Sequence, residues 1–157
     1  MKKHLVYTVI CISLILLVTA GWALLASKKD VPKLLSGQQA IVFKSPTCGC
    51  CGIYIEHLKH NGLVVEIKDV PDVTPIKDSS NIPQTVRSCH TTKIGDYFVE
   101  GHVPAEAIEK LMKEKPDIDG IAMPGMPSGS PGMHGAKIGD FVIYAVKDGQ
   151  ISEFMRL

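Results

Sequence analysis

From residue 40 onward, short apolar runs alternate with segments of helical periodicity. The first two runs and the periodic segment between them predict a strand–helix–strand unit. The apolar run at 40–44 predicts a strand, and 63–69 predicts a second strand. Between them, 50–61 has the apolar spacing of a short amphipathic helix that Gly62 ends. A strand–helix–strand unit of this length needs a right-handed crossover, so we expect the two strands to be parallel.

The second half of the chain predicts a hairpin, a helix and a closing hairpin. These elements are expected at 91–94 with 97–100, from Val103 to the residue before Pro116, and at 141–146 with 150–154. Prolines in 70–84 leave room there for a short helix at most. The predicted order, β-α-β-(α)-β-β-α, is that of a thioredoxin-like α/β fold, and the last hairpin should extend its sheet. The segment from Ile121 to Gly135 is rich in Met, Gly and Pro without a helical or strand period, and predicts a long loop.

The N-terminus predicts export. Lys2 and Lys3 precede an apolar run from Leu5 to Ala26, which is typical of a signal peptide or of an N-terminal membrane anchor. We therefore divide the chain into a targeting segment at 1–26, a linker at 27–39 and a single domain at 40–157. The domain is expected to be periplasmic or exported, with the N-terminal segment as its only membrane contact.

Composition narrows the range of partners. The chain has 157 residues and a formal charge of +1, and no basic patch is interleaved with aromatic residues. This balance argues against nucleic acid as a partner.

Three thiols crowd the loop between the first strand and the first helix. Cys48, Cys50 and Cys51 fall within four residues at the predicted helix start, where the helix dipole and unpaired N–H groups favour thiolate. Thiolates bind soft metals and attack disulfides, so the cluster is a metal site or a redox pair with one spare thiol. A single structural disulfide is the plainer alternative for an exported protein. Three thiols at one helix start favour the functional interpretation.

A fourth exported thiol, Cys89, lies just before the third predicted strand. In a thioredoxin-like fold this segment packs beside the redox loop, so Cys89 could complete a four-thiolate site or join a disulfide; a buried free thiol is the alternative. His90 and His102 are candidate supporting residues, as ligands or as hydrogen-bond partners of ligands, with packing or capping as the alternative. His57 and His60, one helical turn apart, are expected on a solvated helix face.

The Met/Gly/Pro segment carries soft donors. Its candidate metal ligands are Met123, Met126, Met133 and His134. Thioether, thiolate and imidazole together form the ligand set that Cu(I) prefers, whereas packing is the usual role of methionine. In a loop without a regular face we favour copper contact.

Four motifs together resemble one bacterial family. They are Ser45-Pro-Thr-Cys-Gly-Cys-Cys-Gly52, Ser88-Cys-His-Thr91, Glu100-Gly-His-Val-Pro104 and Met123-Pro-Gly-Met-Pro-Ser-Gly-Ser-Pro-Gly-Met133. The chain is similar from about residue 40 onward to small exported metal-binding proteins of the CopG-like copper-resistance family. The resemblance implies a thioredoxin-like domain that binds copper through clustered thiols and acts in periplasmic copper handling.

Two functional hypotheses follow. In the first, the protein holds Cu(I) on Cys48, Cys50, Cys51 and Cys89 with Met/His support, in copper resistance or copper redox handling and with other periplasmic copper proteins as candidate partners. In the second, it is a thiol–disulfide oxidoreductase that uses Cys48 and Cys51. A zinc site is a weaker third, because copper outcompetes zinc at exported thiolates. We do not expect a conventional enzyme, and copper or thiol redox chemistry is the candidate activity.

Overall fold

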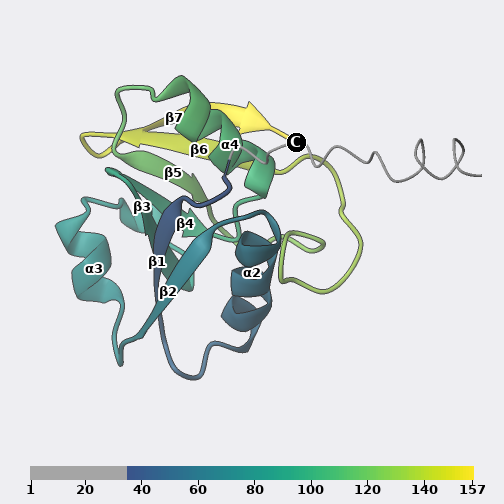
Figure 1. Cartoon of the computed structure of the whole chain (residues 1–157). Helices are drawn as coiled ribbons and strands as arrows, with labels where there is room; N and C mark the ends of the chain where they lie inside the picture. Colours follow the sequence, from purple (N-terminus) through teal and green to yellow (C-terminus); the bar gives the residue numbers. More distant parts are fainter. Residues whose placement is uncertain (1–34) are drawn as a thin grey trace, which may run out of the picture. The chain divides into compact units, whose positions relative to one another are not determined.

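The computed structural model describes residues 35–157, which fold around a mixed sheet of seven strands (Figure 1). The strands lie in the order β2-β1-β3-β4-β5-β6-β7. Their bounds are β1 Gln39–Lys44, β2 Val64–Asp69, β3 His90–Ile94, β4 Tyr97–Gly101, β5 Gly120–Met123, β6 Val142–Lys147 and β7 Gln150–Arg156. The helices are α2 Gly49–His60, α3 Thr74–Ser79 and α4 Ala105–Glu114, with a 3-10 turn at Gln84–Val86.

The first half of the sheet follows the predicted plan. β1 and β2 are parallel and joined by α2, while β3 runs antiparallel to β1 with Lys44 opposite His90. β4 returns antiparallel to β3. Because the C-terminal end of β1 lies beside the N-terminal end of β3, the loop that carries Cys48 comes close to the segment that carries Cys89. The α/β class and the predicted order of elements are confirmed.

Helices cover both faces of the sheet. α2 and α4 pack on one face around a core of buried aliphatic side chains that includes Leu58, Ile108 and Val99. α3 and the 3-10 turn lie on the other face (Figure 1), where Val86 and Phe98 belong to a second, smaller cluster. The end of β1 that precedes Cys48 and the start of β3 that follows Cys89 therefore belong to a sheet packed on both faces, in which Lys44 pairs with His90.

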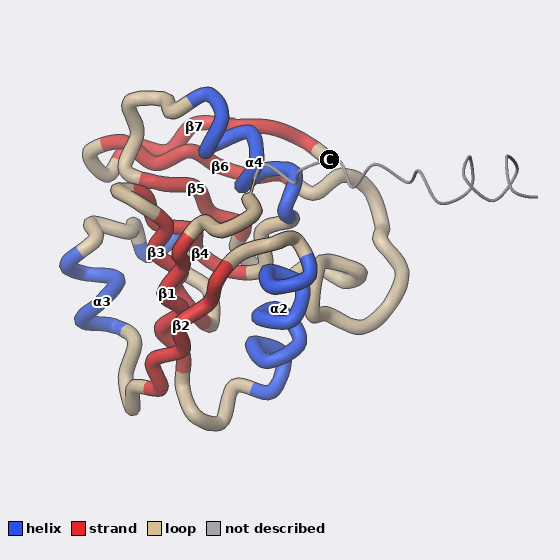
Figure 2. The backbone as a smooth tube through the Cα atoms, in the orientation of Figure 1, coloured by secondary structure: helices blue, strands red, loops and turns tan. Residues whose placement is uncertain are grey.

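One sequence prediction is wrong. The segment from Ile121 to Gly135 was expected to contain no strand, but Gly120–Met123 forms β5, parallel to β4 and antiparallel to β6. All four residues of β5 are buried, so the strand lacks the alternation of polar and apolar positions that reveals a half-exposed strand. The long loop after β5 lies beside α2 (Figure 2).

Described residues that precede β1 also pack on the main core. Leu35 is fully buried there. Gly37 donates its N–H to the carbonyl of Gly62 at 3.0 Å, which ties this segment to the end of α2. The predicted targeting segment at 1–26 lies outside the described residues. Within 35–157, no helix has both the length and the apolar character that crossing a membrane requires.

Candidate metal centre

The first wall of the site is the N-terminus of α2. A turn at Ser45 precedes it: the Ser45 hydroxyl pairs with that of Thr47 at 2.9 Å, and the Ser45 carbonyl accepts the Cys48 N–H at 3.0 Å. Cys48 is the N-cap residue, and no side chain caps the helix there. The thiols of Cys48, Cys50 and Cys51 therefore sit where the helix dipole favours negative charge.

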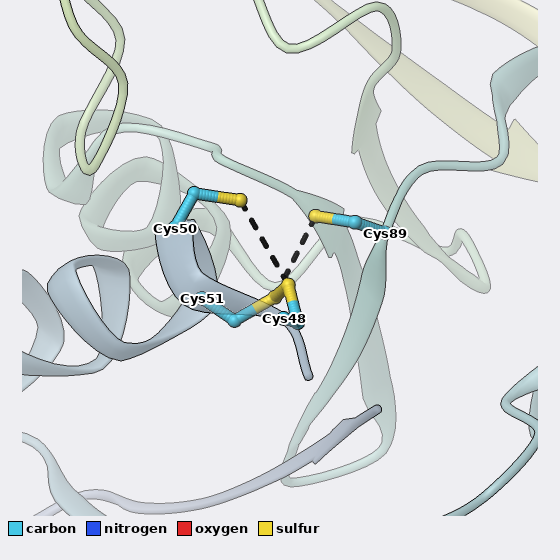
Figure 3. Close-up of side chains that lie close together, drawn as sticks. All are labelled: Cys48, Cys50, Cys51 and Cys89. Carbon is cyan, nitrogen blue, oxygen red and sulfur yellow. Dashed lines mark hydrogen bonds between the residues drawn. A yellow bond between two sulfur atoms is a disulfide. The ribbon is translucent and has the colours of Figure 1, made fainter. Parts of the chain in front are cut away.

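The structure brings the four predicted thiols into one cluster (Figure 3). Cys48 and Cys51 form a disulfide, and Cys50 and Cys89 are free thiols. The Cys50 sulfur lies 3.8 Å from that of Cys48, and the Cys89 sulfur lies 3.7 Å from that of Cys51. All four sulfur atoms are within 4.8 Å of one another, so one metal ion can reach them after reduction of the disulfide.

Cys89 also belongs to a second ligand group, with His90 and His102. The Cys89 sulfur is 3.3 Å from Nδ1 of His90 and 3.2 Å from Nε2 of His102. His102 Nδ1 lies 2.7 Å from the carbonyl oxygen of Pro131. A carbonyl only accepts hydrogen bonds, so Nδ1 of neutral His102 carries the proton and Nε2 presents its lone pair to Cys89. This orientation by an outer carbonyl is the usual arrangement of a metal-binding histidine.

Burial keeps the two histidines neutral. Burial, with His102 and Lys77 nearby, lowers the pKa of His90 to about 3. Burial likewise lowers the pKa of His102, against the opposing effect of its bond to Pro131. Both rings therefore have a free lone pair for a metal at neutral pH.

Burial favours the protonated form of the Cys89 thiol. Burial, followed by the neighbouring Cys50, raises the pKa of Cys89 to about 11. Metal binding at Cys89 must therefore displace a proton, because the thiolate is the ligand.

The ring of Tyr54 packs against the rings of both His90 and His102. Its buried ring lies with its centroid 4.7 Å from that of His90 and 5.2 Å from that of His102. Its hydroxyl donates to the carbonyl of Val103 at 3.0 Å. Because Tyr54 belongs to α2, it links the helix of the cysteines to the strands of the histidines.

The predicted Met/His ligands occupy different environments. Met123 is buried in the main core as part of β5, which gives it the packing role. Met126 is 38% exposed with a φ of 46°, Met133 is half-buried and His134 is exposed. The backbone of His134 closes the loop, since its carbonyl accepts the hydroxyl of Ser128 at 2.9 Å. The thiols and the two histidines thus form the compact part of the site.

Gly132 brings this loop against the cysteine helix. A Cβ atom at Gly132, whose φ is +83°, would lie 2.9 Å from the Tyr54 nitrogen, 3.0 Å from the Cys50 carbonyl oxygen and 3.2 Å from His102 Nδ1. Only glycine allows so close an approach in this conformation. The preceding carbonyl, that of Pro131, orients His102, so the loop helps to shape the site through its backbone.

Sequence reasoning placed His57 and His60 on a solvated helix face. His60 is exposed, but His57 is half-buried and stacks on Tyr54 at 6.1 Å between ring centroids. Burial lowers the pKa of His57. Among the groups of residues in 35–157 that could hold a metal, neither of these histidines takes part.

Sequence reasoning missed a buried ion pair behind Cys89. Lys77 of α3 and Glu100 of β4 face each other in the interior, with 4% and 0% of their side chains exposed. Glu100 was noted as part of a motif, and its position in a strand of buried residues was the available signal. Lys77 lies in a segment interrupted by prolines, where the spacing of apolar residues does not predict which side chains face the core.

Comparison with solved structures places this geometry in a family. Two solved structures, described as "Copper resistance protein copG- Form 2" and "Copper resistance protein copG- Form 1", match with TM-scores of 0.72 and 0.71, each at 38% identity. The matches cover 78% of this chain and 99% and 98% of the CopG chains. The chain belongs to the CopG family.

A family model supports the same assignment. The model described as "Protein of unknown function, DUF411" matches residues 86–133, a range that holds Cys89, His90 and His102 together with the Met/Gly/Pro segment up to Met133. The cysteines of α2 lie outside that range. No curated protein matches the chain.

Proposed function

We propose that this CopG-family protein binds Cu(I) and acts in copper resistance or copper redox handling. The observation that carries the proposal is that four cysteine sulfurs form one group and Cys89 forms a second with two imidazoles, the ligand atoms of each group lying within 4.8 Å of one another. Thiolate and imidazole ligands suit soft metal ions and disfavour Mg²⁺ and Ca²⁺. The name of the matched structures supports copper as the metal.

The disulfide gives the site two states. In the oxidised state, Cys48 and Cys51 are bonded to each other, and Cys50, Cys89, His90 and His102 remain as donors. An external dithiol reductant breaks that bond by thiol–disulfide exchange: it supplies two electrons and two protons, becomes a disulfide itself and restores two thiols, which then lose their protons when a metal binds. Reduction therefore increases the number of sulfur ligands from two to four, and copper capacity follows the redox state of this pair.

We propose that the protein works in the periplasm, carried there by its N-terminal apolar run and serving other copper-handling proteins. The support is the basic start and long apolar stretch at 1–26. A thiol cluster with a disulfide state fits an oxidising compartment.

Anaerobic titration of the reduced protein with Cu(I) tests the proposal. We expect at least one Cu(I) per chain, and a weaker complex in Cys50→Ser because one of the four sulfurs is lost. Met133→Leu should weaken binding more than Met126→Leu, because Met133 is half-buried and follows Gly132, which lies against Cys50 of α2, whereas Met126 is exposed. A wild-type protein that binds no Cu(I) would refute the proposal.

A second function is favoured by one specific observation. The disulfide joins Cys48 and Cys51, which have the Cys-x-x-Cys spacing at a helix N-terminus that thiol–disulfide oxidoreductases use. Insulin reduction by Cys50→Ser distinguishes the two functions. Insulin reduction that survives in that variant would favour the oxidoreductase, because Cys48 and Cys51 would then act as a redox pair without Cys50.

A further inference from the structure

The buried ion pair behind Cys89 contributes no atom to either candidate ligand group. Transfer of Lys77 and Glu100 from water to the interior costs several kcal/mol for each ion, and apolar residues of similar volume are often as stable or more so. Stability alone therefore gives a weak reason for the pair. Its hydrogen bonds give a stronger one.

One carboxylate holds both ends of the segment that carries Cys89. Oε1 of Glu100 accepts the backbone N–H of Ser88 at 2.5 Å, and Oε2 accepts the hydroxyl of Thr91 at 2.6 Å. Lys77 Nζ pairs with Oε1 and also donates to the Thr91 hydroxyl at 3.0 Å. Ser88 and Thr91 flank Cys89 and His90, so a single carboxylate holds the Ser88 backbone on one side of two candidate ligands and the Thr91 side chain on the other.

The next residue of β4 reinforces this contact. A Cβ atom at Gly101 would lie 2.8 Å from the Cβ of Ser88 and 2.7 Å from the carbonyl oxygen of Met123, and the φ of Gly101 is +79°. The end of β4 thus approaches Ser88 as closely as a backbone can. His102 follows directly, so Glu100 and Gly101 hold Ser88 in place immediately before β4 delivers the second histidine.

We propose that Lys77 and Glu100 are positioning residues of the metal centre. Glu100 fixes the backbone of Ser88 and thereby holds the sulfur of Cys89 between His90 and His102, while Lys77 balances the buried charge. The inference rests on the proposed copper binding. Cys89 is the ligand that the two donor groups share, so a small displacement of its sulfur affects both.

The decisive variant replaces both ions with apolar residues. Lys77→Met/Glu100→Leu leaves no unpaired charge, so we expect an unfolding midpoint in urea at or above that of the wild type. The Ser88 N–H loses its acceptor, and we expect its hydrogen exchange in the metal-free protein to accelerate at least about tenfold. Cu(I) affinity, measured by competition with a chromogenic chelator, should fall by about 10- to 100-fold, as for other residues that orient metal ligands.

Two further variants separate positioning from charge. Glu100→Gln keeps one oxygen for the Ser88 N–H, so its Cu(I) affinity should fall less than that of the double variant. Lys147→Gln/Asp117→Asn removes an exposed ion pair, whose side chains are 42% and 94% exposed, and should change neither exchange at Ser88 nor Cu(I) affinity.

Two results would overturn the inference. One is a folded double variant with wild-type Cu(I) affinity and wild-type exchange at Ser88. If the double variant does not fold, Lys77→Leu/Glu100→Met, a second apolar pair without an acceptor for the Ser88 N–H, decides, and wild-type values for both measurements in that variant would overturn the inference equally. Absence of Cu(I) binding by the wild type would instead refute the proposed function, and exchange at Ser88 in the metal-free protein would still test the positioning.

Discussion

The two walls of the metal centre are built differently. The α2 wall, made of Cys48, Cys50 and Cys51, stands at a helix start where no side chain caps the helix, and two of its three thiols are joined in a disulfide. The β wall consists of Cys89, His90 and His102.

Residues that are not candidate ligands position the β wall. The carbonyl of Pro131 orients His102, and Glu100 holds the N–H of the residue before Cys89. The covalent state of the α2 wall can change, while the geometry of the β wall is fixed by the fold. We infer that the α2 wall sets how many sulfurs are available and that the β wall sets where the metal sits.

Loss of a sulfur from each wall provides the strongest test of this division. Cys89→Ser should weaken Cu(I) binding by more than about 100-fold, beyond the usual effect of removing an outer partner, because Cys89 serves both ligand groups. Cys50→Ser removes one sulfur from one group and should weaken binding less. Competition with a chelator measures both, and equal losses in the two variants would contradict the division.

Acid should destabilise the β wall through His90. Its pKa is about 3 in the folded protein, compared with about 6.5 in an unfolded chain, so the unfolded state binds more protons between these values. Stability is therefore full above pH 6.5 and falls as the pH drops toward 3. At about 1.36 kcal/mol per pH unit, the loss from pH 6.5 to pH 5 is about 2 kcal/mol.

Urea unfolding of the metal-free protein at pH 7 and pH 5 measures this loss. His90→Gln cannot take up a proton at this position, so its stability should fall less over the same range. An identical pH dependence in the wild type and the variant would show that His90 is not held neutral by burial.

The contact between the Met/Gly/Pro loop and the two walls can be tested at Gly132. Gly132→Ala should cost about 1–3 kcal/mol more than Gly125→Ala, because the added methyl meets Tyr54, Cys50 and His102. Gly125 is the matched control, since its φ of +81° resembles the +83° of Gly132 but its Cβ would meet open space. Urea unfolding gives the two costs, and equal values would exclude a close contact at Gly132.

The sequence predicted the parts of the fold that leave a local pattern. The helix with Cys50 and Cys51, both hairpins and the parallel pair of first strands follow from spacing, glycine turns and prolines. β5 was missed because a short strand buried on both faces shows no alternation. The missed strand is also why Met123, in the core, was taken for a residue of an open loop.

The site was predictable in its residue types but not in its connections. Spacing and the expected fold brought Cys89 to the other thiols, and His90 and His102 were recognised as candidates. Their shared contact with Cys89 depends on the β3–β4 pairing and on the bond of His102 to Pro131, which join residues far apart in the chain. Lys77 and Glu100 are likewise far apart in the chain, and the local sequence around neither residue predicts their pairing.

X-ray absorption at the copper edge tests the central claim most directly. In the reduced protein loaded anaerobically with Cu(I), we predict a coordination shell with both sulfur and imidazole nitrogen. The imidazole contribution should disappear in His90→Ala/His102→Ala and persist in His57→Ala/His60→Ala, the pair outside both ligand groups. A shell without sulfur, or an imidazole signal that survives removal of His90 and His102, would contradict the account.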